Sequence, residues 1–155
     1  MGNISSRHAA RACSCIALLL GSLAANASND SSGTIKVVHG DVRIERAGLV
    51  TPALVGDAVQ ALDRVSTGKD GSVGITLKDE TQLSSGPNSA LVVRAFAFDT
   101  KTHEGKLETS LLKGTLRFVS GLMAKLNPRS VQIITRQMTI GIRGTDFIVE
   151  VPDED

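Results

Sequence analysis

The chain has 155 residues, a length that favours a single domain. It carries 17 Lys and Arg against 16 Asp and Glu, and its only aromatic residues are four Phe. The near-neutral charge argues against a nucleic-acid or anionic-membrane surface, which needs clustered positive charge, and the scarcity of aromatic rings argues against base-stacking platforms and sugar-binding clefts.

The first 27 residues have the order of a secretory signal peptide. A basic region at residues 7–11 precedes an apolar stretch at residues 13–23, and residues 25–27 (Ala-Asn-Ala) supply a small-residue cleavage site. The apolar stretch is shorter than the roughly 20 residues that a membrane-spanning helix needs. We therefore predict export to the periplasm with cleavage after Ala27, followed by a polar leader at residues 28–32.

The cysteine positions agree with this interpretation. Both cysteines, Cys13 and Cys15, lie in the predicted signal peptide. The exported chain would then contain no disulfide, no thiol nucleophile and no thiolate metal site. With the signal removed, the net charge is −1, since Arg7 and Arg11 are the only charged residues among the first 27 with histidine taken as neutral.

From Gly33 onward, short apolar–polar alternations are separated by Gly, Asp and Asn turns, which is the pattern of β-strands. Only residues 121–126 are compatible with a helical turn. Residues 90–98 carry apolar side chains on both faces, which predicts a central strand covered on each side. The predicted strands are residues 34–38, 42–46, 64–67, 72–77, 90–98, 106–112, 114–119, 131–135, 138–142 and 145–151.

These elements predict an all-β fold, because many short strands form a sandwich, a barrel or a solenoid. Small aliphatic residues dominate the inward positions, which favours a short β-solenoid-like stack of strands, with a two-sheet β-sandwich as the alternative. The predicted core contains Val37, Val42, Ile44, Val73, Ile75, Leu77, Leu91, Val93, Leu116, Phe118, Ile133, Ile142, Phe147 and Val149.

Several short segments then occur in a characteristic order and spacing. They are residues 33–42 (GTIKVVHGDV), 54–57 (LVGD), 63–68 (DRVSTG), 70–79 (DGSVGITLKD), 86–89 (GPNS), 112–116 (LKGTL) and 140–147 (IGIRGTDF). Together they resemble the periplasmic FecR-type domain, named for the iron-dicitrate sensor protein, over residues 33–151. We expect a stand-alone form of this domain, without the anti-sigma segment or the membrane helix that sensors of the family commonly carry, and with an acidic tail at residues 152–155.

The resemblance identifies a set of family-signature residues that we interpret as mostly structural, because Gly and Asp at turns need no other role. Within this set, Arg143 could contact a partner or an anionic ligand, although pairing with a nearby acid is the simpler interpretation. The signature residues are Gly40, Asp57, Asp70, Gly71, Gly141, Arg143, Gly144, Thr145 and Phe147.

Catalytic and metal-binding patterns are missing from the sequence. His39 and His103 do not form a ligand pair, and no serine-nucleophile motif or phosphate-binding loop is present. Asp99, His103 and Glu104 are close enough in sequence to bind a metal weakly, but a solvated loop is the simpler interpretation. We predict no catalytic residue, no metal and no cofactor.

The predicted function is therefore that of an exported, non-catalytic FecR-like binding module that contacts another periplasmic or outer-membrane protein in sensing or signalling. We expect it to bind no nucleic acid and to have no membrane span after export. A ligand-binding, carbohydrate-binding or enzymatic domain on a β scaffold is the alternative.

The last predicted strand, residues 145–151, supplies a candidate partner surface. Phe147 and Val149 should face the core, which leaves Ile148 on the outer face. If this strand lies at a sheet edge, it can pair with another chain, and Arg143 and Ile148 would border the contact. The alternative is that the acidic tail at residues 152–155 repels other strand edges and keeps the protein monomeric, since charge also protects edges from pairing.

Overall fold

The computed structural model describes residues 31–143 and 146–152, and it is all-β as predicted. Two short helices, α1 (Leu122–Leu126) and the 3₁₀ turn η1 (Pro128–Ser130), interrupt the strands, and α1 confirms the predicted helical turn. The strands are β1 (Ser31–His39), β2 (Val42–Arg46), β3 (Leu49–Pro52), β4 (Ala58–Gln60), β5 (Arg64–Thr67), β6 (Ser72–Leu77), β7 (Gln82–Ser85), β8 (Ala90–Phe98), β9 (Gly105–Val119), β10 (Val131–Ile134), β11 (Thr139–Gly141) and β12 (Asp146–Val151).

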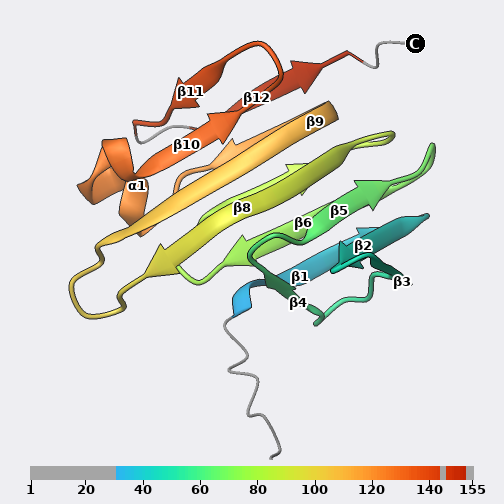
Figure 1. The fold of residues 1–155 in the computed structure, drawn as a ribbon, viewed down its shortest axis with the longest axis horizontal. Helices are drawn as coiled ribbons and strands as arrows, with labels where there is room; N and C mark the ends of the chain where they lie inside the picture. The colour runs from blue at the N-terminus through green and yellow to red at the C-terminus, as the bar shows by residue number, and fades with distance from the viewer. Residues whose placement is uncertain (1–30, 144–145, 153–155) are drawn as a thin grey trace, which may run out of the picture.

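The strands form one curled, mostly antiparallel sheet (Figure 1). Its order is β3-β2-β5-β8-β9-β7-β6-β1-β4, with β10 and β12 pairing on β9 and β11 pairing on β10. β10 is parallel to β9, and the other pairs are antiparallel. The expected solenoid stack is therefore not what the structure shows, because neighbouring strands are joined by hairpins and long crossovers rather than by repeated coils.

β9 is the strand on which the sheet curls. Its first half pairs with β8 and β10, whereas its second half pairs with β7 and β12. Between the halves, Gly114 has a φ of +81°, and a Cβ on Gly114 would clash with the side chain of Ser89. The Ser89 hydroxyl accepts a hydrogen bond of 2.9 Å from the amide of Thr115. The two strands predicted here are thus one strand, bent at a residue that only glycine suits.

β-Bulges explain where the predicted faces were wrong. In β1 the register shifts between Ile35 and Val37, so Val37 is 50% exposed and Val38 packs against the core in its place. A bulge adds one residue to one strand and so reverses which face the following residues occupy. The prediction of Val37 as a core residue is wrong for this reason.

β8 contains the same kind of shift, between Val93 and Ala95. Leu91 and Val93 are buried before it, and Phe96 and Phe98 pack on the same core after it. β8 is central, lying between β5 and β9, but only the face of Leu91 and Val93 packs on the core, whereas Arg94 and Ala97 are exposed, so the strand is not covered on both faces as predicted.

The core lies inside the curl of the sheet. The other predicted core residues are buried, except that Phe147 and Val149 are half-buried and pack against its margin.

The fully buried carboxylate of Asp79 accepts hydrogen bonds from the hydroxyl and the amide of Thr81, and the Asp79 carbonyl accepts one from the amide of Leu122. These bonds hold the start of α1 against the turn between β6 and β7. Within residues 31–143 and 146–152, no helix is long and apolar enough to cross a membrane.

Candidate functional site

The β2–β3 hairpin forms one border of the sheet (Figure 1). Its two-residue turn, Ala47-Gly48, has φ values of +50° and +82°, as a type I′ turn requires. The register pairs Arg46 with Leu49 and Ile44 with Thr51. Along the described part of the chain, β3 pairs with β2 alone, so its other side is an open edge.

The hairpin geometry determines which backbone groups this edge offers. In a two-residue hairpin, the residues that flank the turn exchange hydrogen bonds, and every second pair then repeats this pattern. Val50 lies between two hydrogen-bonded pairs, so its N–H and C=O point away from β2 and toward the open edge. Pro52 is the next such position and has no N–H, which limits how far a further strand can pair.

Both faces of β3 are exposed and carry apolar side chains. Leu49 is 68% exposed and Val50 is 53% exposed. On the face of Leu49 and Thr51 lies a hollow of about 300 Å³, which is also lined by Ile44, Arg46, Asp57 and Ala58. On the face of Val50 and Pro52 lies a second hollow, of about 260 Å³. An added strand would project successive side chains toward the two hollows in turn.

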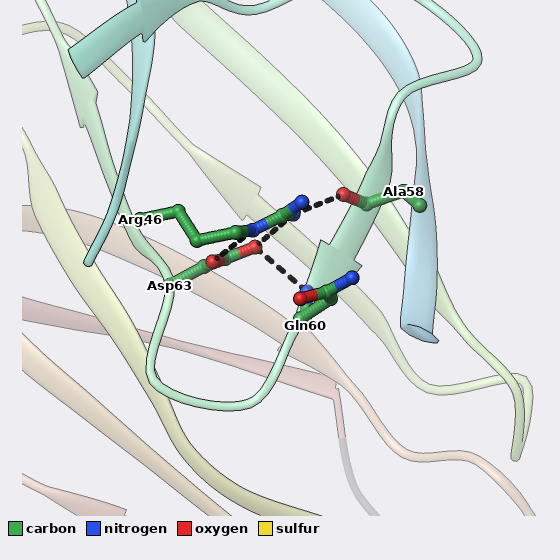
Figure 2. A network of polar contacts seen from close by, with 4 residues as sticks. All are labelled: Arg46, Ala58, Gln60 and Asp63. Carbon is green, nitrogen blue, oxygen red and sulfur yellow. Dashed lines mark hydrogen bonds and ion pairs between the residues drawn. The ribbon is translucent and has the colours of Figure 1, made fainter. Parts of the chain in front are cut away.

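An ion pair between the half-exposed Arg46 and the buried Asp63 holds this border in place (Figure 2). Arg46 donates hydrogen bonds of 2.8 and 2.6 Å to the Asp63 carboxylate and one of 2.8 Å to the carbonyl of Ala58. The amide of Gln60 also donates to Asp63, at 2.7 Å. The hydrogen bond to Asp63 raises the pKa of Arg46. The cluster ties the hairpin to β4 and to the loop that precedes β5.

β12 lies off the main strand order and pairs with the second half of β9, on the side away from β7. The predicted alternation is observed: Phe147 and Val149 are half-buried, whereas Ile148 is 69% exposed. Arg117 donates hydrogen bonds of 3.0 and 2.6 Å to Asp146, and this contact lowers the pKa of the Asp146 carboxyl. Ile148 thus lies on the outer face beside an exposed ion pair.

A basic hollow of about 380 Å³ lies near the start of β12. It is lined by Asn127, Pro128, Arg129 and Arg143. Neither arginine forms an ion pair with any of the residues that the structure describes, so the expected pairing of Arg143 with a nearby acid is not observed. Residues 109–145 contain six Lys and Arg and no Asp or Glu. Two guanidinium groups in one hollow favour a carboxylate or phosphate ligand.

The glycines and aspartates of the family signature occupy turns. A Cβ at Gly40 would clash with the backbone of Asp70, and one at Gly71 would clash with the backbone of Asp41. The Asp57 carboxylate accepts a hydrogen bond of 2.8 Å from the amide of Leu54. These contacts support a structural role for the turn residues.

The remaining signature residues behave differently from one another. Gly141 has open space where a Cβ would lie. Phe147 stacks on Phe118 with ring centroids 5.6 Å apart. Gly144 and Thr145 lie outside the described residues. The signature therefore does not form a single cluster: Asp57 lines the hollow beside Leu49, and Arg143 lines the hollow that contains Arg129.

The candidate metal loop is organised by hydrogen bonds. Asp99 accepts hydrogen bonds from the amides of Lys101 and Thr102, which lower the pKa of its carboxyl. His103 stacks on Phe98 with ring centroids 6.1 Å apart. No group of three metal-ligating side chains occurs within residues 31–143 and 146–152.

Sequence reasoning missed β3 and the apolar edge that it forms. Residues 49–52 are short and end in proline, which weakens the strand signal. The available signal was Gly48, two residues after a predicted strand and directly before Leu49 and Val50. Sequence reasoning also missed that Arg129 and Arg143 line one hollow, because Arg129 lies in η1 and Arg143 lies 14 residues later, in the segment before β12.

Comparison with known proteins agrees with the resemblance seen in the sequence. No curated protein and no solved structure matches the chain. The family model described as FecR protein matches residues 63–155, which is more than half of the chain and runs from the buried Asp63 through β12. The chain therefore belongs to the FecR family.

Proposed function

We propose that this FecR-family chain is an exported, non-catalytic module that binds an extended segment of another envelope protein along β3. The observation that carries the proposal is the open β3 edge, which has apolar side chains on both faces and a hollow beside each face. Strand addition uses backbone hydrogen bonds for affinity and pockets for alternate side chains for selectivity.

The chemistry of the two hollows indicates what such a segment would contain. Ile44, Leu49 and Ala58 contribute apolar surface to the first hollow. In the second hollow, Val50 and Pro52 lie beside the exposed Asp41–Arg43 ion pair. A segment with an aliphatic side chain on one face and a polar side chain on the other would match both hollows, the polar side chain lying beside the Asp41–Arg43 ion pair. The backbone N–H and C=O of Val50 would form the hydrogen bonds to this segment.

The predicted signal peptide and the FecR membership support a periplasmic location. Cleavage after Ala27 would release a periplasmic chain that begins at Ser28. N-terminal sequencing of the protein from the envelope fraction tests this step. A first residue of Ser28 is expected, and an intact Met1 there would contradict it.

A matched pair of valines tests the β3 surface. Val50→Lys places a charge on the β3 edge, whereas Val37→Lys places the same charge at an equally exposed position on β1, near the other end of the strand order. An envelope protein captured by the wild type and then purified should bind wild type and Val37→Lys alike, and Val50→Lys about tenfold more weakly or less. Equal binding by all three would reject the β3 surface.

A further inference from the structure

We propose that the hollow lined by Arg129 and Arg143 is a phosphate-binding site, in which the two guanidinium groups hold the phosphate group of an anionic ligand. The hollow has a volume of about 380 Å³, and Asn127 and Pro128 complete its lining. The helix α1, which leads into η1, lies far from β3 in Figure 1. The site is therefore separate from the proposed partner surface.

The backbone beneath the two arginines is anchored in the core. The amide of Ile142 donates a hydrogen bond of 3.2 Å to the carbonyl of Val131, and both of these side chains are buried. Arg143 directly follows one of these residues, and Arg129 lies two positions before the other. The hydrogen bond thus holds the two arginine backbones near each other before a ligand arrives, which lowers the cost of ordering the site.

Asn127 adds a neutral donor to the hollow. Its carbonyl accepts hydrogen bonds of 3.0 and 2.6 Å from the amide and the hydroxyl of Ser130, which close the turn that carries Arg129. Asn127 is exposed, and its side-chain amide forms no hydrogen bond within the described part of the chain. This amide can therefore donate to an oxygen of the ligand.

The charge around the hollow is positive and lacks a local counter-ion. Four of the other arginines form ion pairs with carboxylates: Arg43, Arg46, Arg64 and Arg117. Neither Arg129 nor Arg143 has such a partner among residues 31–143 and 146–152, and residues 109–143 contain six Lys and Arg and no Asp or Glu. The acids that flank this run, Glu108 and Asp146, are engaged in ion pairs of their own. The hollow therefore attracts an anion from solution.

The donor set suits a phosphate group better than a single carboxylate. A guanidinium group donates through a planar fork, which one edge of a carboxylate fills. Arg129 and Arg143 come from two separate segments, so their forks approach a ligand from different sides. A phosphate group has at least three acceptor oxygens in a tetrahedral arrangement and can accept from both forks at once.

Titration with sodium phosphate, with the ionic strength held constant by sodium chloride, tests the site in solution. The NMR resonances of the Arg129 and Arg143 side chains should shift saturably, with a Kd of about 1 mM. Arg129→Gln and Arg143→Gln should each weaken binding about fivefold or more, with an unchanged thermal midpoint in phosphate-free buffer. Acetate should bind about threefold more weakly than phosphate or less, and equal binding would overturn the assignment to phosphate.

Arg94→Gln is the matched control, and Val50→Lys separates the site from β3. Arg94 is an exposed arginine on β8 that also forms no ion pair in the described ranges. Both variants should keep the wild-type Kd for phosphate within about twofold. A loss of binding in Val50→Lys would move the anion site to β3 and overturn the proposal.

Cosedimentation with phosphatidylglycerol vesicles distinguishes a soluble phosphate compound from a lipid headgroup. A lipid source predicts that the wild type sediments with the vesicles and that the double variant Arg129→Gln/Arg143→Gln does not. A soluble source predicts that the wild type stays in the supernatant while it binds free phosphate. A wild type that binds neither vesicles nor phosphate at about 100 mM, or a double variant that binds as well as the wild type, would overturn the proposal.

Discussion

The guanidinium group of Arg46 donates two hydrogen bonds to the carboxylate of Asp63, whose side chain has no exposed surface. Asp63 also accepts the amide of Gln60, so its charge is compensated from two directions. This pair joins the hairpin that bears the open β3 edge to the loop that precedes β5. It lies at the point where the family match begins.

Arg46→Ala should destabilise the fold, because it leaves the Asp63 carboxylate buried without its cation. We expect a loss of about 2 kcal/mol, less than for a fully buried pair, since the Arg46 side chain is 43% exposed. Arg43→Ala is the matched control, because its ion pair with Asp41 is exposed on both sides, and it should change the unfolding free energy by less than about 0.5 kcal/mol. Urea unfolding measures both free energies. Equal losses would contradict the claim that the buried Asp63 carboxylate depends on Arg46 for its stability.

Gly114→Ala should disrupt the bend in β9. The position has a positive φ, and the added methyl group would clash with Ser89, so the expected loss is about 2–4 kcal/mol. Gly141→Ala adds a methyl group in open space and should cost less than about 0.5 kcal/mol. Thermal unfolding of the two variants checks this difference. If Gly114→Ala unfolds at the same temperature as Gly141→Ala, β9 can bend without a glycine at this position.

Phe118→Ala should cost about 3–5 kcal/mol, because this ring is fully buried in the core. Phe147→Ala removes the ring that stacks on Phe118, but Phe147 is half-buried at the margin of the sheet. Its loss should therefore be the smaller of the two, measured by urea unfolding at a protein concentration below that of any self-association. A larger loss for Phe147 would show that β12 is more deeply packed than its exposure indicates.

The Asp146 carboxyl should titrate below its ordinary pKa of about 3.9, because Arg117 hydrogen-bonds to its charged form. A pKa that is lowered in the folded state stabilises the fold above the unfolded value, and this contribution is lost as the pH falls through the folded pKa. Arg117→Gln should raise the NMR titration midpoint of Asp146 toward the ordinary value. An unchanged midpoint would show that the pair does not persist in solution.

The sequence by itself determined the fold class, the turn positions and the family. Period-two alternation and Gly/Asp turns are local signals, so they predicted the all-β fold and turn roles for Asp57, Gly40 and Gly71. The alternation around Ile148 also predicted correctly which residues of β12 face outward.

Only the tertiary structure decided which faces meet and which residues gather. The bulges in β1 and β8 reverse the faces of Val38 and Phe96 because an extra residue breaks the two-residue period, and no local pattern marks its position. The curl of β9 depends on contact between Gly114 and Ser89, which are far apart in the chain. Arg129 and Arg143 share a hollow for the same reason: strand pairing, rather than sequence proximity, brings η1 to the start of β12.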